Sequence, residues 1–561
     1  MTREDLDLIR KIDGRRKSLD SERSSFIPHW QEISDYISPR TSRYMRNDRN
    51  RGEKYNLRII NETGTLASRT CQAGMMAGMS SPARPWFLLA PPDPEMSEYG
   101  PVKQWLDVVT RMMRDVFVRS NLYSVLPKVY GSMADYGTGA FGLVEDDIEV
   151  VRAYPFSIGS YMLACDHRMQ VDTIYREFAM TVAQMVAKFG LANVSATVKA
   201  MYDVGKYQEW IPVIHAIEPN INAKSGSLRN SEKAFVSVYY EEGRKEEGAL
   251  RISGFDEFPA LAPRWYVDGE DTYGTRCPGM DALGSVKAIQ LEERRKYQAI
   301  DKHVNPAMNA DASLRNSGAD ILPGGINWVP GMASGGNPGF KPIHQIDPQA
   351  VNILSMDIKE VEYRINRCYY VDMMMMLAQG ENSQMTAREV EERHQEKLLV
   401  LGPLMEQSND DLFDPLIDRV FNIMVRQGKL PPAPEELQGQ PLRVEYTSIM
   451  AQAQKLIGVT GVERFVGFVG QLSEAKQDPS VWDKVDTDQA IDEYADMTGV
   501  PSKIVVPDDV VAAKREERAQ AQAAQQGAAM VPAMKDGAMA AKILSETDVA
   551  GQNALTRMLG V

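Results

Sequence analysis

The chain has 561 residues, of which 43% are hydrophobic and 25% are charged, a composition typical of a folded, core-forming protein and not of a disordered one. Its length predicts about three or four domain-sized units, because one hydrophobic core rarely serves so many residues. The formal net charge of −14 argues against a protein that grips duplex DNA through a broad basic face, since phosphate neutralisation supplies most of the affinity of such proteins.

The N-terminal region predicts a long helix over residues 1–38, because apolar residues recur at near-helical spacing as far as Pro39. Its charged start, Met1–Asp5, has no apolar core of a secretory signal, so we expect synthesis and folding in the cytoplasm. A basic stretch follows at 40–58, where seven basic residues outweigh two acidic ones. This stretch could pair with a neighbouring subunit or partner, contact nucleic acid, or form a solvated surface.

The next segments alternate between helix and strand. A small-residue helix is expected at 61–79, then a strand at Trp86–Leu89 and helical structure at 101–136. From about 143 to 275 the pattern changes to short strands around one helix, which indicates an α+β domain. The expected elements are strands at 150–151, 173–175, 210–215 and 235–240, and a helix at 182–189.

Two helices flanking a Gly/Pro-rich insertion form the most informative part of the chain. The first runs from Asp281 to His303 and is closed by Pro306. We expect one apolar face on it, and about 40 residues rich in Gly, Pro, Asn and Ser follow, a length that usually indicates a functional loop or an external partner. The residues of that face are Leu283, Val286, Ile289, Tyr297, Ile300 and Val304.

The second helix begins at Asp347-Pro348, an N-cap residue followed by proline at the first helical position. Its narrow apolar seam is typical of a helix packed against parallel neighbours. The methionine run at 373–376 is interpreted as adaptable packing and not as a ligand set. The seam consists of Val351, Leu354, Ile358, Val361, Ile365 and Cys368.

A polar break at 379–384 precedes a third helix that opens with the capping box Thr386–Glu389. This helix is expected to bend near Gly402-Pro403 and to end at Gly428. Residues 431–445 are Pro-rich, with a strand at 442–446, and 447–500 read as mixed helix. The last 50 or so residues predict a long polar helix or a tail.

Sequence motifs for catalysis are absent or out of context. Gly137–Gly142 matches G-x-G-x-x-G, but it lies between a predicted helix and a predicted strand, the reverse of a dinucleotide site, so we interpret it as a tight turn. His394 lies among Glu391, Glu392 and Glu396, which we interpret as a solvated helix face. We therefore expect no catalytic residues, metal or cofactor. Free, buried thiols are expected at Cys71, Cys165, Cys277 and Cys368, which lack C-x-x-C spacing.

Four segments in order resemble the portal, or head-to-tail connector, family of short-tailed bacteriophages, and they span residues 30–431. They are Trp30–Arg40, Gly78–Phe87 with the small-residue segment before it, Met385–Val390 with its continuation to Leu404, and Asn422–Pro431. The resemblance implies an α+β, mostly helical fold that assembles as a cyclic, usually dodecameric ring around an axial channel for double-stranded DNA. It implies a virion protein made in the host cytoplasm, located at the capsid portal vertex and acting in genome packaging and ejection.

Partners and regions also follow from this resemblance. The partners would be a terminase ATPase, tail adaptor proteins that replace it, and capsid, scaffold or internal core proteins. The regions would be a wing (1–280), a first stem helix (281–305), a clip (306–346), a second stem helix (347–378), a tunnel loop (379–385), wing and crown helices (386–500) and a C-terminal crown segment or tail (501–561).

An acidic tube with a few basic rings would centre DNA without holding it, because few phosphate contacts give little affinity. The alternatives are a tail adaptor ring and, in the 143–275 domain, a nucleotide-using or hydrolytic enzyme. The candidates for DNA contact are Arg294, Arg295, Lys296 and Lys302 on the first stem helix and Gln379, Gly380, Glu381, Asn382, Ser383 and Gln384 in the loop.

Overall fold

The chain forms two compact units in a computed structural model. Unit 1 comprises Met1–Leu88, Val109–Pro431 and Val444–Ile457, and unit 2 comprises Leu89–Val108, Pro432–Arg443 and Gly458–Val561. The structure describes residues 3–41, 57–93, 96, 99–224, 226–227, 229–310, 320, 340–342, 347–379, 402–437, 439–440, 442–476, 479–498, 505–506 and 510–521.

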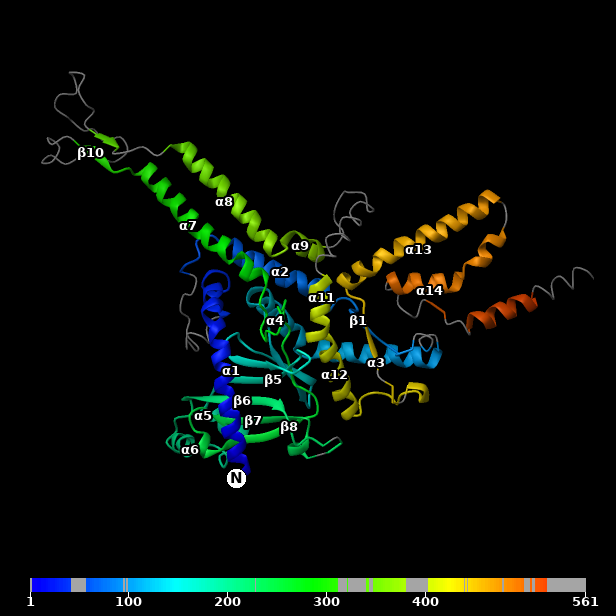
Figure 1. Cartoon of the computed structure of the whole chain (residues 1–561), viewed down its shortest axis with the longest axis horizontal. Helices are drawn as coiled ribbons and strands as arrows, with labels where there is room; N and C mark the ends of the chain where they lie inside the picture. Colours follow the sequence, from blue (N-terminus) through cyan, green and yellow to red (C-terminus); the bar gives the residue numbers. More distant parts are fainter. Residues whose placement is uncertain are drawn as a thin grey trace, which may run out of the picture. The chain divides into compact units, whose positions relative to one another are not determined.

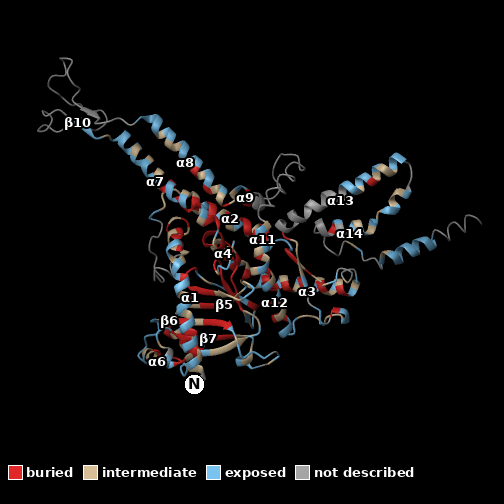
Figure 2. Ribbon diagram, viewed as in Figure 1, coloured by how far each residue is buried: buried red, intermediate tan, exposed pale blue. Residues whose placement is uncertain are grey.

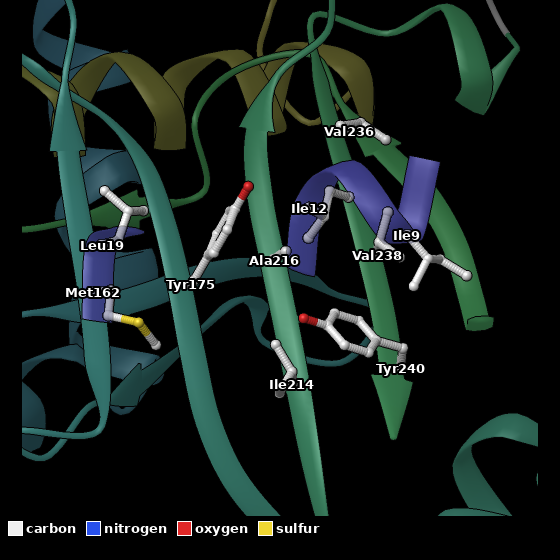
Figure 3. Close-up of a cluster of buried hydrophobic side chains, with 10 residues drawn as sticks. All are labelled: Ile9, Ile12, Leu19, Met162, Tyr175, Ile214, Ala216, Val236, Val238 and Tyr240. Carbon is white, nitrogen blue, oxygen red and sulfur yellow. The ribbon is translucent and has the colours of Figure 1, made fainter. Parts of the chain in front are cut away.

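The first helix of unit 1, α1 (Arg3–Tyr36), confirms the long N-terminal helix and lies across a five-stranded antiparallel sheet (Figures 1 and 3). The strand order of this sheet is β4-β5-β6-β7-β8. Burial of one apolar stripe of α1 against one sheet face supplies the core between them. This core consists of Ile9, Ile12 and Leu19 of α1 with Met162, Tyr175, Ile214, Ala216, Val236, Val238 and Tyr240 of the strands.

The strands predicted near 173, 210 and 235 are confirmed as parts of β5 (Val171–Thr181), β6 (Trp210–Pro219) and β7 (Phe235–Glu241). The sequence pattern missed β4 (Tyr161–Cys165) and β8 (Ala249–Phe255), whose residues do not alternate cleanly.

The other face of the sheet is partly covered by α5 (Val182–Phe189), which was predicted, and α6 (Ala196–Asp203), which was not. Thr181 and Gln184 form a capping box that fixes the start of α5. The apolar contact between these helices and the sheet includes Val182, Met185, Phe189, Val194, Val198, Val213 and Leu250.

The turn predicted at Gly137–Gly142 joins α4 (Leu122–Tyr136) to β2 (Phe141–Asp146), as expected for a helix-to-strand connection. Gly137 has φ of 78° and caps α4 in the left-handed conformation, which a side chain would disfavour. β2 pairs with β3 (Val150–Pro155) and β9 (Ala260–Leu261).

The helical stretch predicted at 101–136 is divided into α3 (Gly100–Arg119) and α4. Before them lie α2 (Thr63–Met79) and β1 (Phe87–Ala90), both close to their predicted ranges.

The two helices flanking the Gly/Pro-rich insertion form a hairpin. They are α7 (Pro278–Val304) and α8 (Pro348–Cys368), which pack against each other. As predicted, Asp347 caps α8 by accepting a hydrogen bond from the backbone N–H of Gln349 at 2.9 Å. Beyond the hairpin, β10 (Met308–Ala310) pairs with β11 (Phe340–Pro342), a short ladder that the sequence did not predict.

One helix predicted over 347–378 is instead two helices, because the chain turns at Tyr369 and Tyr370 before α9 (Val371–Gln379). Tyr370 has φ of 53°, a left-handed conformation that ends α8. In the methionine run, Met373 and Met374 are buried, which confirms the predicted packing role for these two residues. Met375 is exposed.

The chain after the capping box at 386–389, which lies outside the described residues, returns as α11 (Gly402–Ser408), a π-helical turn (Asn409–Phe413) and α12 (Asp414–Arg426). The described part of this helix is irregular at the π turn. The bend predicted near Gly402-Pro403 stays a prediction, because residues 380–401 lie outside the described residues. Gly428 follows the end of α12 with φ of 63°, as predicted. Buried Arg264 joins this segment to the sheet region through paired hydrogen bonds to Asp411 at 2.9 and 3.0 Å.

The C-terminal elements include β12 (Arg443–Tyr446), which confirms the predicted strand, α13 (Ile449–Lys476) and α14 (Thr487–Thr498). In unit 2, the Arg515 guanidinium donates to both oxygens of Asp488 at 2.6 and 2.7 Å. Short 3₁₀ turns lie at Asn230–Glu232, Lys245–Glu247, Glu435–Leu437 and Pro479–Lys484.

All four cysteines are free, as predicted, with Cys71 and Cys277 buried and Cys165 and Cys368 half-buried. Among the described residues, no helix combines the length and the apolar character that crossing a membrane requires.

Candidate functional site at the base of the helical hairpin

The predicted basic candidates lie along the outer part of α7. Arg294, Arg295 and Lys302 are exposed. Lys296 is half-buried and its ammonium lies 3.4 Å from the carboxylate of Glu293, whose side chain is 9% exposed. Lys296 therefore has a structural partner within its own helix, whereas the other three present their charges to the surroundings.

Most of the predicted loop candidates cannot be placed. Gln379 is the last residue of α9, while Gly380, Glu381, Asn382, Ser383 and Gln384 lie outside the described residues. The same holds for most of the basic stretch at 40–58 and for the His394 cluster. At the end of that stretch, Arg58 pairs with Asp35 at 3.1 Å, so this member is used within the chain.

Burial changes along the hairpin. Figure 2 shows buried residues near α2 and α9 and mostly exposed ones toward β10. Val286 and Ile289 of α7 are fully buried, whereas Tyr297, Ile300 and Val304 of the predicted apolar face are 58%, 39% and 77% exposed. The base of the hairpin is thus fixed in the core, while its outer part leaves large apolar side chains uncovered in a single chain.

A polar contact joins the start of α2 to both hairpin helices. The Gln290 amide accepts from the backbone N–H groups of Ile60 and Asn61 and donates to the Asn61 carbonyl at 2.8 Å. The Asn61 amide donates to Glu362 of α8 at 3.1 Å. Because these groups satisfy each other away from water, they fix the relative position of the three helices.

A buried carboxylate, Asp135 at the end of α4, lies at the centre of this region. It accepts hydrogen bonds from the hydroxyls of Ser38, Ser68 and Tyr369, the last two at 3.0 Å. Burial raises the pKa of Asp135, and the three hydroxyls oppose that rise. One side chain therefore connects the end of α1, α2, α4 and the junction between α8 and α9.

Glycines allow the helices around Asp135 to approach closely. A Cβ on Gly279 of α7 would lie 2.4 Å from the Asp135 carbonyl oxygen, and one on Gly74 of α2 would lie 2.4 Å from the Cβ of Met374 in α9. The small-residue composition of α2 thus has a packing reason, since a larger residue would push these helices apart.

The charges of the hairpin helices nearly balance, although the whole chain is acidic. α7 carries five Lys and Arg against four Asp and Glu, and α8 carries three against three. Burial, followed by the nearby Asp357 carboxylate, raises the pKa of Glu292, and the guanidiniums of Arg364 and Arg295 oppose this rise. The hairpin offers alternating charges and no continuous basic surface for tight binding of a polyanion.

Sequence reasoning missed the Asp135 contact because its partners lie far from it along the chain. Its only local signal was a lone carboxylate among apolar residues of α4, next to Ala134 and Tyr136, which suggests a buried charge. Within the described residues, no group of three or more His, Cys, Asp and Glu side chains is arranged to hold a metal ion.

Comparison with known proteins gives a consistent result. A family model described as "Bacteriophage head to tail connecting protein" matches residues 10–505. The chain is 49% identical over 538 residues to the portal protein of Salmonella phage epsilon15, covering 96% of this chain and 95% of that protein. It is 44% identical over 543 residues to a probable portal protein of Bordetella phage BPP-1, covering 97% and 96%.

Proposed function

This chain belongs to the family of bacteriophage head-to-tail connecting proteins and has a portal role, and from this premise we propose that it forms a closed ring around a channel for double-stranded DNA. A connector of this kind has the capsid and the tail as partners. The ring would be a homo-oligomer, usually a dodecamer in this family, at the capsid vertex of the virion.

The observation that carries the ring proposal is the uncovered apolar surface of the hairpin. Besides the exposed residues of α7, Ile353, Met356 and Tyr363 of α8 are 67%, 71% and 60% exposed. Single exposed apolar residues are ordinary, but a series along two paired helices is typical of a surface that another protein covers. A neighbouring copy in a cyclic ring would cover the same face in every subunit.

The mechanism is passive guidance of DNA. A cyclic ring repeats each exposed cation of α7 around the axis, so Arg294 or Lys302 becomes a circle of positive charge. Acidic side chains on the same helices limit the number of persistent phosphate contacts, which keeps affinity low and allows DNA to move. The role is structural, and purified protein that hydrolysed nucleotide without another protein would favour the enzymatic alternative instead.

The regions of the ring follow from the hairpin. We assign α7 and α8 to the stem, 306–346 to the clip, 379–385 to the tunnel loop, and the sheet region within 1–280 to the wing. Residues 386–500 would complete the wing and crown, with 501–561 at the crown end. The clip would receive the terminase ATPase during packaging and tail adaptor proteins afterwards, and the crown would contact internal scaffold or core proteins.

Substitution of the exposed hairpin face tests the proposal. Met356→Asp places a charge where a neighbouring copy would cover the side chain, so we expect folded protein that no longer closes into rings in negative-stain images. The matched control is Ile148→Asp, since Ile148 is 90% exposed on the β2–β3 turn and lies off the hairpin. Rings formed equally well by both variants would contradict the assignment of this face.

A further inference from the structure

Four residues form a row across the five-stranded sheet. Arg176 of β5 pairs with His215 of β6, His215 pairs with Tyr239 of β7, and Tyr239 pairs with Arg251 of β8. Residues directly opposite each other in antiparallel strands share one face of the sheet. Their chain neighbours Tyr175, Ile214 and Tyr240 point toward α1 (Figure 3), so the row lies on the opposite face.

Aromatic rings in and beside this row hold cations through cation–π contacts. The His215 and Tyr239 rings stack with centroids 3.7 Å apart and an interplanar angle of 8°. The Lys188 ammonium of α5 lies 4.4 Å from the centroid of the Tyr239 ring. The Arg176 guanidinium lies 4.5 Å from the ring centroids of both Phe156 and Phe178. Lys188 is therefore positioned over the stacked pair, and Arg176 is positioned between two further aromatic rings.

The electrostatics of the row favour an anion. Burial and then the charge of Arg176 lower the pKa of both Lys188 and His215, and Arg251 adds to this effect. In the described part of the chain, no carboxylate lies within ion-pair distance of Lys188 or Arg251. Glu241 lies on the same face of β7, but its carboxylate already accepts a hydrogen bond from the backbone N–H of Ser195 and forms an ion pair with Arg244.

We propose that Arg176 and Arg251 of the row, together with Lys188 of α5, bind an acidic peptide segment of a partner protein. Lys188 and Arg251 are exposed beside the half-buried aromatic pair, so carboxylates can reach both. Guanidinium groups match the planar carboxylate through paired hydrogen bonds, which favours this ligand. The chain has a net charge of −14 and therefore repels anions. A short acidic segment carries only a few negative charges, so this repulsion is small for it. Duplex DNA would extend over the acidic surroundings and be repelled by them.

All residues of this binding site belong to unit 1 of a single chain. An experiment on the purified, full-length protein measures the reactivity of individual lysines toward an amine-acylating reagent by mass spectrometry. The probe is a synthetic peptide of alternating glutamate and glycine. We expect the peptide to slow labelling of Lys188 about fivefold, since it occupies the ammonium and raises its pKa. Half-buried Lys199 of α6, whose ammonium donates to the Ala192 carbonyl, should keep its labelling rate.

Variants connect the protection to the row. Arg251→Glu should abolish protection of Lys188, and Arg251→Gln should weaken it by about fivefold in affinity. Arg229→Glu is the matched control, because Arg229 is 81% exposed on the same unit and lies off the row, and it should preserve protection. The uncharged Arg251→Gln variant keeps the test informative if the charge reversal does not fold.

Several outcomes would overturn the inference. They are an absence of protection by the peptide, equal loss of protection in the Arg229→Glu control, and protection by duplex DNA but not by the peptide. A further outcome is that Lys188 fails to react before any peptide is added. That result would show that another copy of the chain covers the row, and it would also overturn the proposal of a separate acidic partner.

Discussion

The close packing of α7 on α4 gives a prediction that compares two glycines of the same helix. Alanine at Gly279 would place its Cβ 2.4, 2.7 and 2.9 Å from the carbonyl O, Cα and carbonyl C of Asp135, distances that real Cβ atoms essentially never show. Alanine at Gly284 would meet nothing within 4 Å. The same substitution should therefore have opposite effects at the two positions.

The magnitude follows from which atoms must move. All three contacts of Gly279 are backbone atoms at the end of a buried helix, so no side-chain rotation relieves them and α7 must shift by about 1 Å. Overpacking of this kind costs about 1–3 kcal/mol, and we expect the upper end for Gly279→Ala. Gly284→Ala should instead stabilise the protein by about 0.5–1 kcal/mol, because alanine loses less backbone entropy in a helix.

Cys277 provides the assay, since it is 1% exposed and its thiol donates to the Asp135 carbonyl at 3.2 Å. If labelling by a maleimide requires local opening, a cost of about 3 kcal/mol should raise the labelling rate of Cys277 roughly 100-fold in Gly279→Ala. Gly284→Ala should label as slowly as the original protein. Equal labelling of Cys277 in the two variants would refute the packing argument.

Three further predictions concern charged groups. Asp135→Ala should cost about 3 kcal/mol by leaving three hydroxyls without an acceptor, and Asp135→Asn should cost less. Because the pKa of Asp135 is raised, its contribution to stability falls as pH rises from its ordinary pKa to the raised value, and denaturation at several pH values should show that the asparagine variant lacks this fall. Arg264→Ala should cost about 3–5 kcal/mol in denaturant titrations by leaving Asp411 buried and unpaired, and Arg264→Lys should not restore the paired geometry. Charge reversal at exposed Arg294 or Lys302 should leave the melting temperature nearly unchanged but reduce the fraction of DNA-filled heads, whereas unaltered filling would remove these residues from the channel.

Local patterns predicted the hairpin well. The N-cap at Asp347 and the apolar spacing of α8 act through neighbouring residues, so the sequence alone reveals them. The turn at Tyr369–Tyr370 was not predictable in this way, because neither residue is glycine or proline. The buried hydrogen bond of Tyr369 to Asp135 helps to hold this turn, and it depends on a residue far away in the sequence.

The same distinction applies to the sites. The exposed cations of α7 were found from their helix position, whereas the partner of Lys296 requires the structure. The Asp135 contact unites residues from four separate segments, and the cationic row depends on the strand register of β5 to β8. Strand register is a tertiary property, because a shift of one residue would turn each side chain to the other face.

Electron cryomicroscopy of the purified, full-length protein can show whether the hairpin lines a channel. We expect closed rings in which α7 and α8 of successive subunits surround an open axial channel wide enough for a DNA duplex, with the exposed apolar face of the hairpin covered by the neighbouring copy. A folded protein that remains monomeric at high concentration, or a ring whose channel is lined by other elements, would contradict this expectation.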